Sequence, residues 1–339
     1  MSVWLIVLAP VAALAVLALF RFTGCGLVVS FDEYQTEPTY SSTVESDTPV
    51  AYWRLGEPHA AEPSPSPTVP NVPVSGGTAK DEMGQHDGTY KAVMLQQPPP
   101  APLSPDSPAA PGALGLEAPG LLELNEQGKT SMSADGGYVE VPFTGSLKLP
   151  SFTVEAMVRP GWSSAERGLF RSVVTFCTVD VTPSKTKAFG FGLFAGPPPG
   201  APGAPDVWQI WLGDGTTFKP FKDPSRDLTP VDFTHTNYLA VTYDDAGKEV
   251  NMYVYVAGAD LDSGAVHPLS GVTVPAYSPV NDPTQSLLIG MHRPPIGSGV
   301  SGPFPLYHPF KGQIQEVALY SKALSIIRVA SHVSIGMHL

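Results

Sequence analysis

The chain has 339 residues, and its 33 glycines and 38 prolines together make up about a fifth of it. Charged residues account for only 15%, against roughly 25% in a typical globular protein, which excludes coiled coils and long helical bundles. The net charge is −12 with no cluster of Lys and Arg, which argues against binding to nucleic acid. Two cysteines, Cys25 and Cys177, are too few for a disulfide scaffold or a zinc site.

The N-terminus carries a candidate membrane segment. Val3–Phe20 is an apolar run of 18 residues broken only by Pro10, long enough to span a bilayer as a helix. The following Phe22–Cys25 (FTGC) resembles a bacterial lipobox, so Cys25 is a candidate for lipidation. No Lys or Arg precedes the run, which is unusual for a signal peptide and leaves a retained transmembrane anchor as the alternative. Both interpretations predict a membrane-anchored, extracytoplasmic protein in the periplasm or at the cell surface.

Composition divides the chain into four parts. They are a transmembrane or lipoprotein signal segment at 1–25, a polar spacer at 26–48, one folded domain at 49–331 and a C-terminal tail at 332–339. The domain is interrupted by three proline-rich stretches, at 58–73, 98–111 and 197–205. Because proline cannot donate to a sheet ladder, these stretches are predicted to be surface loops or spacers.

Between the loops, short segments alternate with the period of a strand. Ala51–Leu55 and Phe152–Val158 place every second side chain on one face, as a half-buried strand requires. Further strands are predicted at Tyr138–Pro142, Ser172–Val179, Phe189–Phe194, Val207–Leu212, Tyr238–Tyr243, Val250–Val256, Ser286–Met291 and Gln313–Tyr320. This pattern indicates an all-β sandwich of two sheets.

Turn residues and one helix complete the predicted fold. Asp214–Gly215 suits a tight hairpin, and Asp244–Gly247 suits a slightly longer one. The single helix predicted within the domain is short, around Ser325–Ser331, with Ser325 as its N-cap. The predicted fold class is therefore an all-β, two-sheet antiparallel sandwich that follows an N-terminal hydrophobic helix.

Seven segments together resemble the LamG-like jelly-roll domain of bacterial surface proteins, within the concanavalin A-like lectin/glucanase superfamily. In chain order they are Pro49–Glu57, Lys80–Tyr90, Gly136–Pro142, Ser151–Pro160, Tyr238–Gly258, Ser286–Gly290 and Phe310–Ser325. The resemblance implies a two-sheet antiparallel jelly roll in which Ala51–Leu55 lies beside Gln313–Tyr320. Related domains bind glycans or proteins.

Calcium is the one cofactor that the resemblance suggests. Glu57, Asp81 and Glu316 lie at the edges of the matching segments and are candidates for calcium ligands that converge at one end of the sandwich. The family usually has Asp where Gln315 stands. Losing that carboxylate weakens the expected site, because calcium takes several oxygen ligands with carboxylates among them.

Catalytic motifs are missing from the sequence. Hydrolases of this superfamily use a Glu-x-Asp-x-Glu or Glu-x-Asp-x-x-Glu strand motif, which supplies the two carboxyl groups of retaining hydrolysis. Only Glu45–Asp47 begins such a pattern; it lacks the third carboxylate and lies in the predicted spacer. There is also no Gly-x-Ser-x-Gly or His-Glu-x-x-His motif. We therefore expect no enzymatic activity. A degenerate glycoside hydrolase is a third possible function, after the two given below.

Three tryptophans are candidates for glycan contacts, because sugars stack their apolar faces on exposed rings. Trp208 and Trp211 lie three apart in one predicted strand, so one should be in the core and the other exposed, and Trp162 is expected on a loop rim. The leading prediction is a non-catalytic module that binds a glycan or a surface protein. The alternative is a structural component of an envelope or surface assembly, which contacts copies of itself.

Overall fold

The structure is a computed structural model that describes most of the chain beyond residue 37. The described residues are 38–55, 76–91, 114–116, 124–125, 129–130, 137–162, 168–182, 185–198, 201, 203–220, 229–257, 272–273, 276–293 and 308–337. The predicted membrane segment, Cys25 and Glu57 lie outside these residues. No helix among the described residues is long and apolar enough to cross a bilayer.

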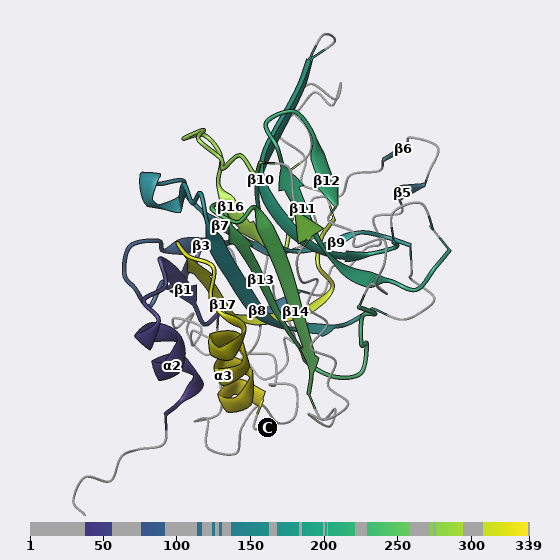
Figure 1. The fold of residues 1–339 in the computed structure, drawn as a ribbon. Coiled ribbons are helices and arrows are strands. Elements are labelled where there is room, and N and C mark those ends of the chain that lie inside the picture. The colour runs from purple at the N-terminus through teal and green to yellow at the C-terminus, as the bar shows by residue number, and fades with distance from the viewer. Residues whose placement is uncertain are drawn as a thin grey trace, which may run out of the picture. The chain divides into compact units, whose positions relative to one another are not determined.

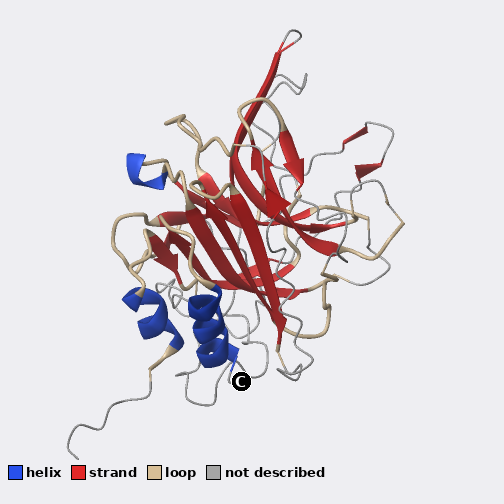
Figure 2. Ribbon diagram, viewed as in Figure 1, coloured by secondary structure: helices blue, strands red, loops and turns tan. Residues whose placement is uncertain are grey.

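Two antiparallel sheets form the described part of the chain (Figures 1 and 2). The first has seven described strands, six of them in spatial order: β1 (Ala51–Trp53), β17 (Gly312–Tyr320), β8 (Phe152–Pro160), β13 (Asn237–Asp244), β14 (Glu249–Val256) and β15 (Val272–Thr273). Its seventh strand, β4 (Leu114–Leu116), pairs with β17. The pairing of Ala51 with Leu319 confirms that the first strand of the domain lies beside its last one.

The second sheet has eight described strands. In spatial order they are β12 (Phe218–Pro220), β11 (Val207–Gly213), β10 (Lys185–Gly196), β9 (Arg171–Thr182), β16 (Leu287–Ile289), β7 (Tyr138–Val141), β3 (Gly88–Lys91) and β2 (Thr78–Ala79). Outside both sheets, β5 (Leu124–Asn125) pairs with β6 (Lys129–Thr130), and Gly145–Leu147 is a short 3-10 helix. The two-sheet sandwich predicted from strand periodicity is confirmed, and so is the jelly roll that the resemblance implies.

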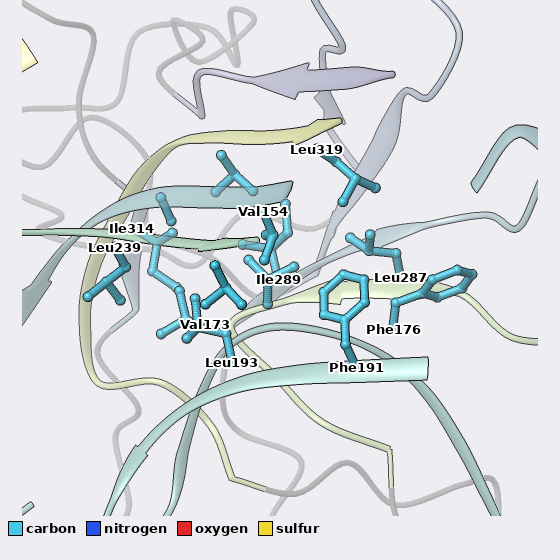
Figure 3. Packing of buried hydrophobic residues seen from close by; sticks show 14 of the residues in the cluster. Val154, Val173, Phe176, Phe191, Leu193, Leu239, Leu287, Ile289, Ile314 and Leu319 are labelled. Carbon is cyan, nitrogen blue, oxygen red and sulfur yellow. The ribbon is translucent and has the colours of Figure 1, made fainter. Parts of the chain in front are cut away.

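The hydrophobic core fills the space between the sheets. Alternation along each strand turns Val154 and Ile314 of the first sheet toward Phe191 and Leu193 of the second, and all four are at most 1% exposed (Figure 3). The ring of Phe152 stacks on that of Phe191 with centroids 4.6 Å apart. Such aromatic pairs add stability beyond the area they bury.

Two helices cover the outer face of the first sheet. They are α2 (Tyr40–Ser46) and α3 (Ile326–Met337), which lie side by side below β1 and β17 in Figure 1. Their apolar side chains pack on the outward-facing residues of that sheet in a second buried cluster. The cluster contains Val44, Tyr52, Met157, Tyr238, Tyr320, Val329, Val333 and Met337.

The helices also correct two of the predicted boundaries. The folded unit begins at Pro38, so α2 occupies part of the stretch predicted as a spacer. Ser325 caps α3 as predicted, accepting a 3.4 Å hydrogen bond from the backbone N–H of Arg328. The helix however continues to Met337 rather than ending near Ser331, because His332, Val333 and Met337 are buried against the sheet. The predicted tail is thus largely part of the domain.

Candidate functional site: an aromatic surface on the second sheet

Strand β11 places its two tryptophans on opposite faces of the second sheet, as their odd spacing predicts. Trp208 is 1% exposed in the core, and its indole N–H donates to Asn237 Oδ1 at 3.1 Å. Trp211 is partly exposed on the outer face. Only the second of these rings is therefore in a position to meet a ligand.

Trp211 belongs to a group of six rings on this outer face, which we call the aromatic platform. Its members are Phe170, Phe194, Trp211, Phe218, His292 and His308. The Trp211 ring lies 5.5 Å from Phe170, 5.9 Å from Phe194 and 5.8 Å from Phe218, measured between centroids. None of the six belongs to either buried hydrophobic cluster. The platform is thus separate from both the core between the sheets and the cluster under the helices.

Hydrogen bonds fix the orientation of the Trp211 indole. Its Nε1–H donates to Gln209 Oε1 at 3.3 Å. The Gln209 amide is itself held, because its Nε2 donates to the carbonyls of Gly196 (3.0 Å) and Pro197 (2.8 Å). Gln209 is only 1% exposed, so this support is buried beneath the ring. A ring held in this way loses little conformational freedom when a ligand binds.

The rings of the platform lie close over the backbone of β10, which is possible because glycines stand beneath them. A Cβ on Gly192 would come within 2.4 Å of the Phe194 ring, and one on Gly196 within 2.5 Å of the Phe170 ring. Alternating glycines in a strand signal a close approach by another group. These glycines are a sequence signal for the platform in addition to the spacing of Trp208 and Trp211.

The two histidines of the platform are neutral at physiological pH. Burial lowers the pKa of His292 to about 3 and that of His308 to about 4. Phe218 stacks on His292 with an interplanar angle of 7°. Cys177 Sγ lies 3.5 Å from His292 Nδ1, and burial raises the pKa of this thiol to about 12, so it stays protonated. Phe194 (3% exposed) and His292 (8%) are buried, so the partly exposed rings of the platform are Phe170, Trp211, Phe218 and the neutral His308.

Trp162 lies in the core rather than on a loop rim. It is 3% exposed, its Nε1–H donates to Asp206 Oδ2 at 3.1 Å, and Phe310 packs edge-on against it. The Arg171 guanidinium carbon lies 4.5 Å from the ring centroid. The rings of Phe233 and Phe310 and the Asp206 carboxylate surround this indole, which leaves no face for stacking.

Asp81 is buried, and its carboxylate organises the turn that follows β2. Oδ1 accepts backbone N–H groups from Tyr52 (2.8 Å) and Met83 (3.1 Å), and Oδ2 accepts those of Gln85 and His86, both at 2.9 Å. Four N–H donors occupy the two oxygens. The structural task of Asp81 is thus to join this turn to β1.

Glu316 binds the side chain of Tyr52, the residue whose backbone N–H donates to Asp81. Its carboxylate accepts the Tyr52 hydroxyl and lies 3.3 Å from Nε and Nη2 of Arg54. Burial raises the pKa of Glu316, although the charge of Arg54 opposes this shift. The structure thus brings Asp81 and Glu316 to one tyrosine, but protein donors occupy both carboxylates, which does not fit calcium coordination. No group of three side chains able to hold a metal ion occurs in the described part of the chain.

Comparison with known proteins gives only distant structural likenesses. No known protein family and no curated protein matches the sequence. One similar solved structure is the sialidase CBM40 of Ruminococcus gnavus bound to alpha2,3 sialyllactose, with 14% identity over 54% of this chain and 82% of that one and a TM-score of 0.36.

Two further likenesses are of the same order. A SAP-like pentraxin from Limulus polyphemus has 10% identity over 55% of this chain and 70% of that one, with a TM-score of 0.33. A putative carbohydrate binding protein from Bacteroides ovatus has 18% identity over 57% and 43%, with a TM-score of 0.34. Likenesses this distant carry no argument about a ligand.

Proposed function

We propose that this protein is a non-catalytic recognition module that binds glycan through the aromatic platform. The observation that carries the proposal is the Trp211 ring, partly exposed, flanked by three phenylalanines and fixed by a buried amide. Saccharides present an apolar C–H face that stacks on such rings, while polar neighbours take the hydroxyls. The imidazoles of His292 and His308 pack against Phe218 and Phe194 and add no charge to the platform.

Support for a non-catalytic role comes from the composition of the platform. Retaining glycoside hydrolysis needs two carboxyl groups about 5 Å apart at the sugar. No Asp or Glu belongs to the six platform residues. The ionisable side chains there are two imidazoles that stay neutral at pH 7. The platform is suited to holding a sugar, not to cleaving one.

The proposal includes attachment to a membrane and display outside the cytoplasm, which rest on the sequence of Val3–Phe20 and Cys25. Intact-mass measurement on protein from the membrane fraction tests this part. A lipid adduct on Cys25 identifies a lipoprotein, and unmodified chain that still starts at Met1 identifies a retained helix. Full-length, unmodified protein found only in the cytosol contradicts the tether.

Glycan-array binding by the detergent-solubilised full chain tests the ligand class. Trp211→Ala is expected to abolish binding while leaving the thermal melt nearly unchanged. Tyr138→Ala is the matched control, because Tyr138 is a partly exposed aromatic residue on β7 of the same sheet, outside the platform. Equal loss in both variants, or no binding by the unmodified protein across a broad array, contradicts the proposal.

A further inference from the structure

The outer face of the first sheet carries a groove next to the start of α3. It has a volume of about 590 Å³ and runs between the β13–β14 hairpin and the loop that leads into the helix. The platform lies on the outer face of the other sheet, so the two places are on opposite sides of the sandwich. The groove is lined by Ser151, Thr242, Asp244, Glu249, Asn251, Tyr253, Ser321, Lys322, Ala323, Leu324, Ser325 and Ile326.

One wall of the groove is held rigidly by a single hydroxyl. Thr153 on β8 is fully buried, and its Oγ1 donates to the carbonyl of Lys322 while accepting the backbone N–H of Leu324, each at 2.8 Å. Ser325 then caps α3. The loop Ser321–Ser325 is therefore tied to the sheet at Lys322 and Leu324, which orders this wall of the groove.

The opposite wall and the floor are also ordered. In the hairpin, the N–H of Asp245 donates to Ser151 Oγ at 3.0 Å, which ties the turn to the start of β8. On the floor, Asn251 Nδ2 donates to Thr242 Oγ1 at 3.4 Å. Tyr253 lies two residues along the strand and contributes a buried ring to the same lining.

Two charged groups of the lining are available to a ligand. Glu249 and Lys322 are both exposed, and neither side chain has a hydrogen bond or ion pair among the described residues. A carboxylate accepts hydrogen bonds from hydroxyl groups, and an ammonium donates to their oxygens. Ile326, which is 47% exposed, provides apolar surface beside these polar groups.

We propose that this groove is a second saccharide site, selective for uncharged sugars, so that one domain holds two glycan chains on opposite faces. Hydroxyls, an amide, a carboxylate and an ammonium next to the exposed side chain of Ile326 match the alternating polar and apolar surface of a sugar ring. Asp244 and Glu249 outnumber Lys322 in the lining, which disfavours anionic saccharides. The inference rests on the proposed function for the class of ligand, whereas the groove itself is independent of the platform.

With two sites on opposite faces, the domain can bind two glycan strands at once. A single chain would bridge two glycan strands, and copies held on one surface would bind a polymer with an avidity above that of either site. A domain with only the platform would bind one strand and leave a polymer in solution uncrosslinked.

Isothermal titration of the detergent-solubilised full chain tests this proposal, with laminarihexaose, mannohexaose and galactohexaose as neutral probes and hexagalacturonate as the anionic one. We expect two equivalents of a neutral probe for the unmodified protein and one for Trp211→Ala. In the Trp211→Ala background, Glu249→Gln or Lys322→Gln should weaken the remaining site by roughly tenfold or more, the effect of removing a hydrogen bond to a charged group.

Glu45→Gln is the matched control, because Glu45 is an exposed carboxylate on α2, outside the groove lining. It should leave both equivalents intact. One equivalent that disappears in Trp211→Ala overturns the second site and leaves the proposed function standing. Residual binding that Glu249→Gln and Lys322→Gln do not change, or that prefers hexagalacturonate, also overturns it. No binding of any probe by the unmodified protein contradicts both proposals.

Discussion

His332 on α3 joins two carboxylates from different parts of the fold. Its Nδ1 lies 2.9 Å from Glu155 Oε2 on β8, and its Nε2 lies 3.0 Å from Asp47 Oδ2 at the end of α2. Arg328 Nε also donates to that Asp47 oxygen, at 2.8 Å. The His332 and Glu155 side chains are both fully buried. One imidazole thereby ties both helices to the first sheet.

This arrangement predicts a dependence of stability on pH. Burial alone would lower the pKa of His332, but the hydrogen bond to Glu155 and the charges of Glu155 and Asp47 outweigh it and raise the pKa above the ordinary value. A histidine whose pKa is raised by folding stabilises the fold fully below its unfolded-state pKa of about 6.5. That contribution is lost as the pH rises through the higher folded-state value.

Thermal unfolding between pH 6 and pH 9 measures this effect. The groups that face His332 are Glu155, Asp47 and Arg328, together with the rings of Tyr40 and Tyr320. The melting temperature of the unmodified protein should fall relative to that of His332→Gln as the pH rises. His235→Gln serves as a control on an exposed histidine. Parallel profiles for all three proteins would contradict the role of His332.

Removing one member of the buried pair should cost more than removing both. His332→Leu leaves Glu155 as a buried carboxylate without its cationic partner, and such losses destabilise by about 3–5 kcal/mol. The Tyr320 hydroxyl still donates to Glu155, at 2.5 Å. The double variant Glu155→Leu/His332→Leu should recover part of the loss. Urea unfolding of the unmodified protein, His332→Leu, Glu155→Leu and the double variant gives the coupling energy, and purely additive costs would argue against the ion pair.

The two tryptophans of β11 should differ sharply in their effect on stability. Trp208→Ala empties a core position and removes the donor to Asn237, with an expected cost of about 3–5 kcal/mol. Trp211→Ala removes a partly exposed ring outside the core and should cost much less. Chemical denaturation measures both values. Equal costs would mean that the platform is structural and would weaken the case for a ligand there.

Gly190 on β10 should not tolerate a side chain. Its φ of +87° is a conformation that other residues rarely adopt, and a Cβ there would lie 1.9 Å from the carbonyl oxygen of Phe176. Gly190→Ala should therefore lower the free energy of unfolding by about 1–3 kcal/mol or more, from backbone strain and displacement of β9. Gly203→Ala is the control, because nothing lies within 4 Å of a Cβ at that position. Equal stability of the two variants would contradict this account.

The sandwich was predictable because each strand has its own alternation of apolar and polar residues in the sequence. Phe152–Pro160 and Glu249–Val256 alternate at period two, and each buries one face against the opposite sheet. Helix α2 was not predictable in this way. Its seven residues are too few to form a stable helix alone, and they are helical because Val44 packs on the tyrosine-rich outer face of the sheet.

The platform was only half predictable. Trp211 follows from counting along one strand, but its neighbours Phe170, Phe218 and His292 come from separate parts of the chain that meet only in the folded sheet. The burial of Trp162 was not predictable from the sequence of its own strand. Its position depends on how the backbone turns after β8, which alternation within the strand does not specify.

The bonds to Asp47 also affect how the domain unfolds when force is applied to the chain. A pull on the chain ahead of Pro38 reaches α2 before any strand, and it must break the contacts of Asp47 with Arg328 and His332 before it strains β1. The next contacts to carry the load are the pairing of β1 with β17 and the hydrogen bond from the Tyr52 N–H to Asp81. Because the imidazole of His332 donates to both Asp47 and Glu155 only when it is protonated, the force needed to unfold the domain should decrease as the surroundings become alkaline.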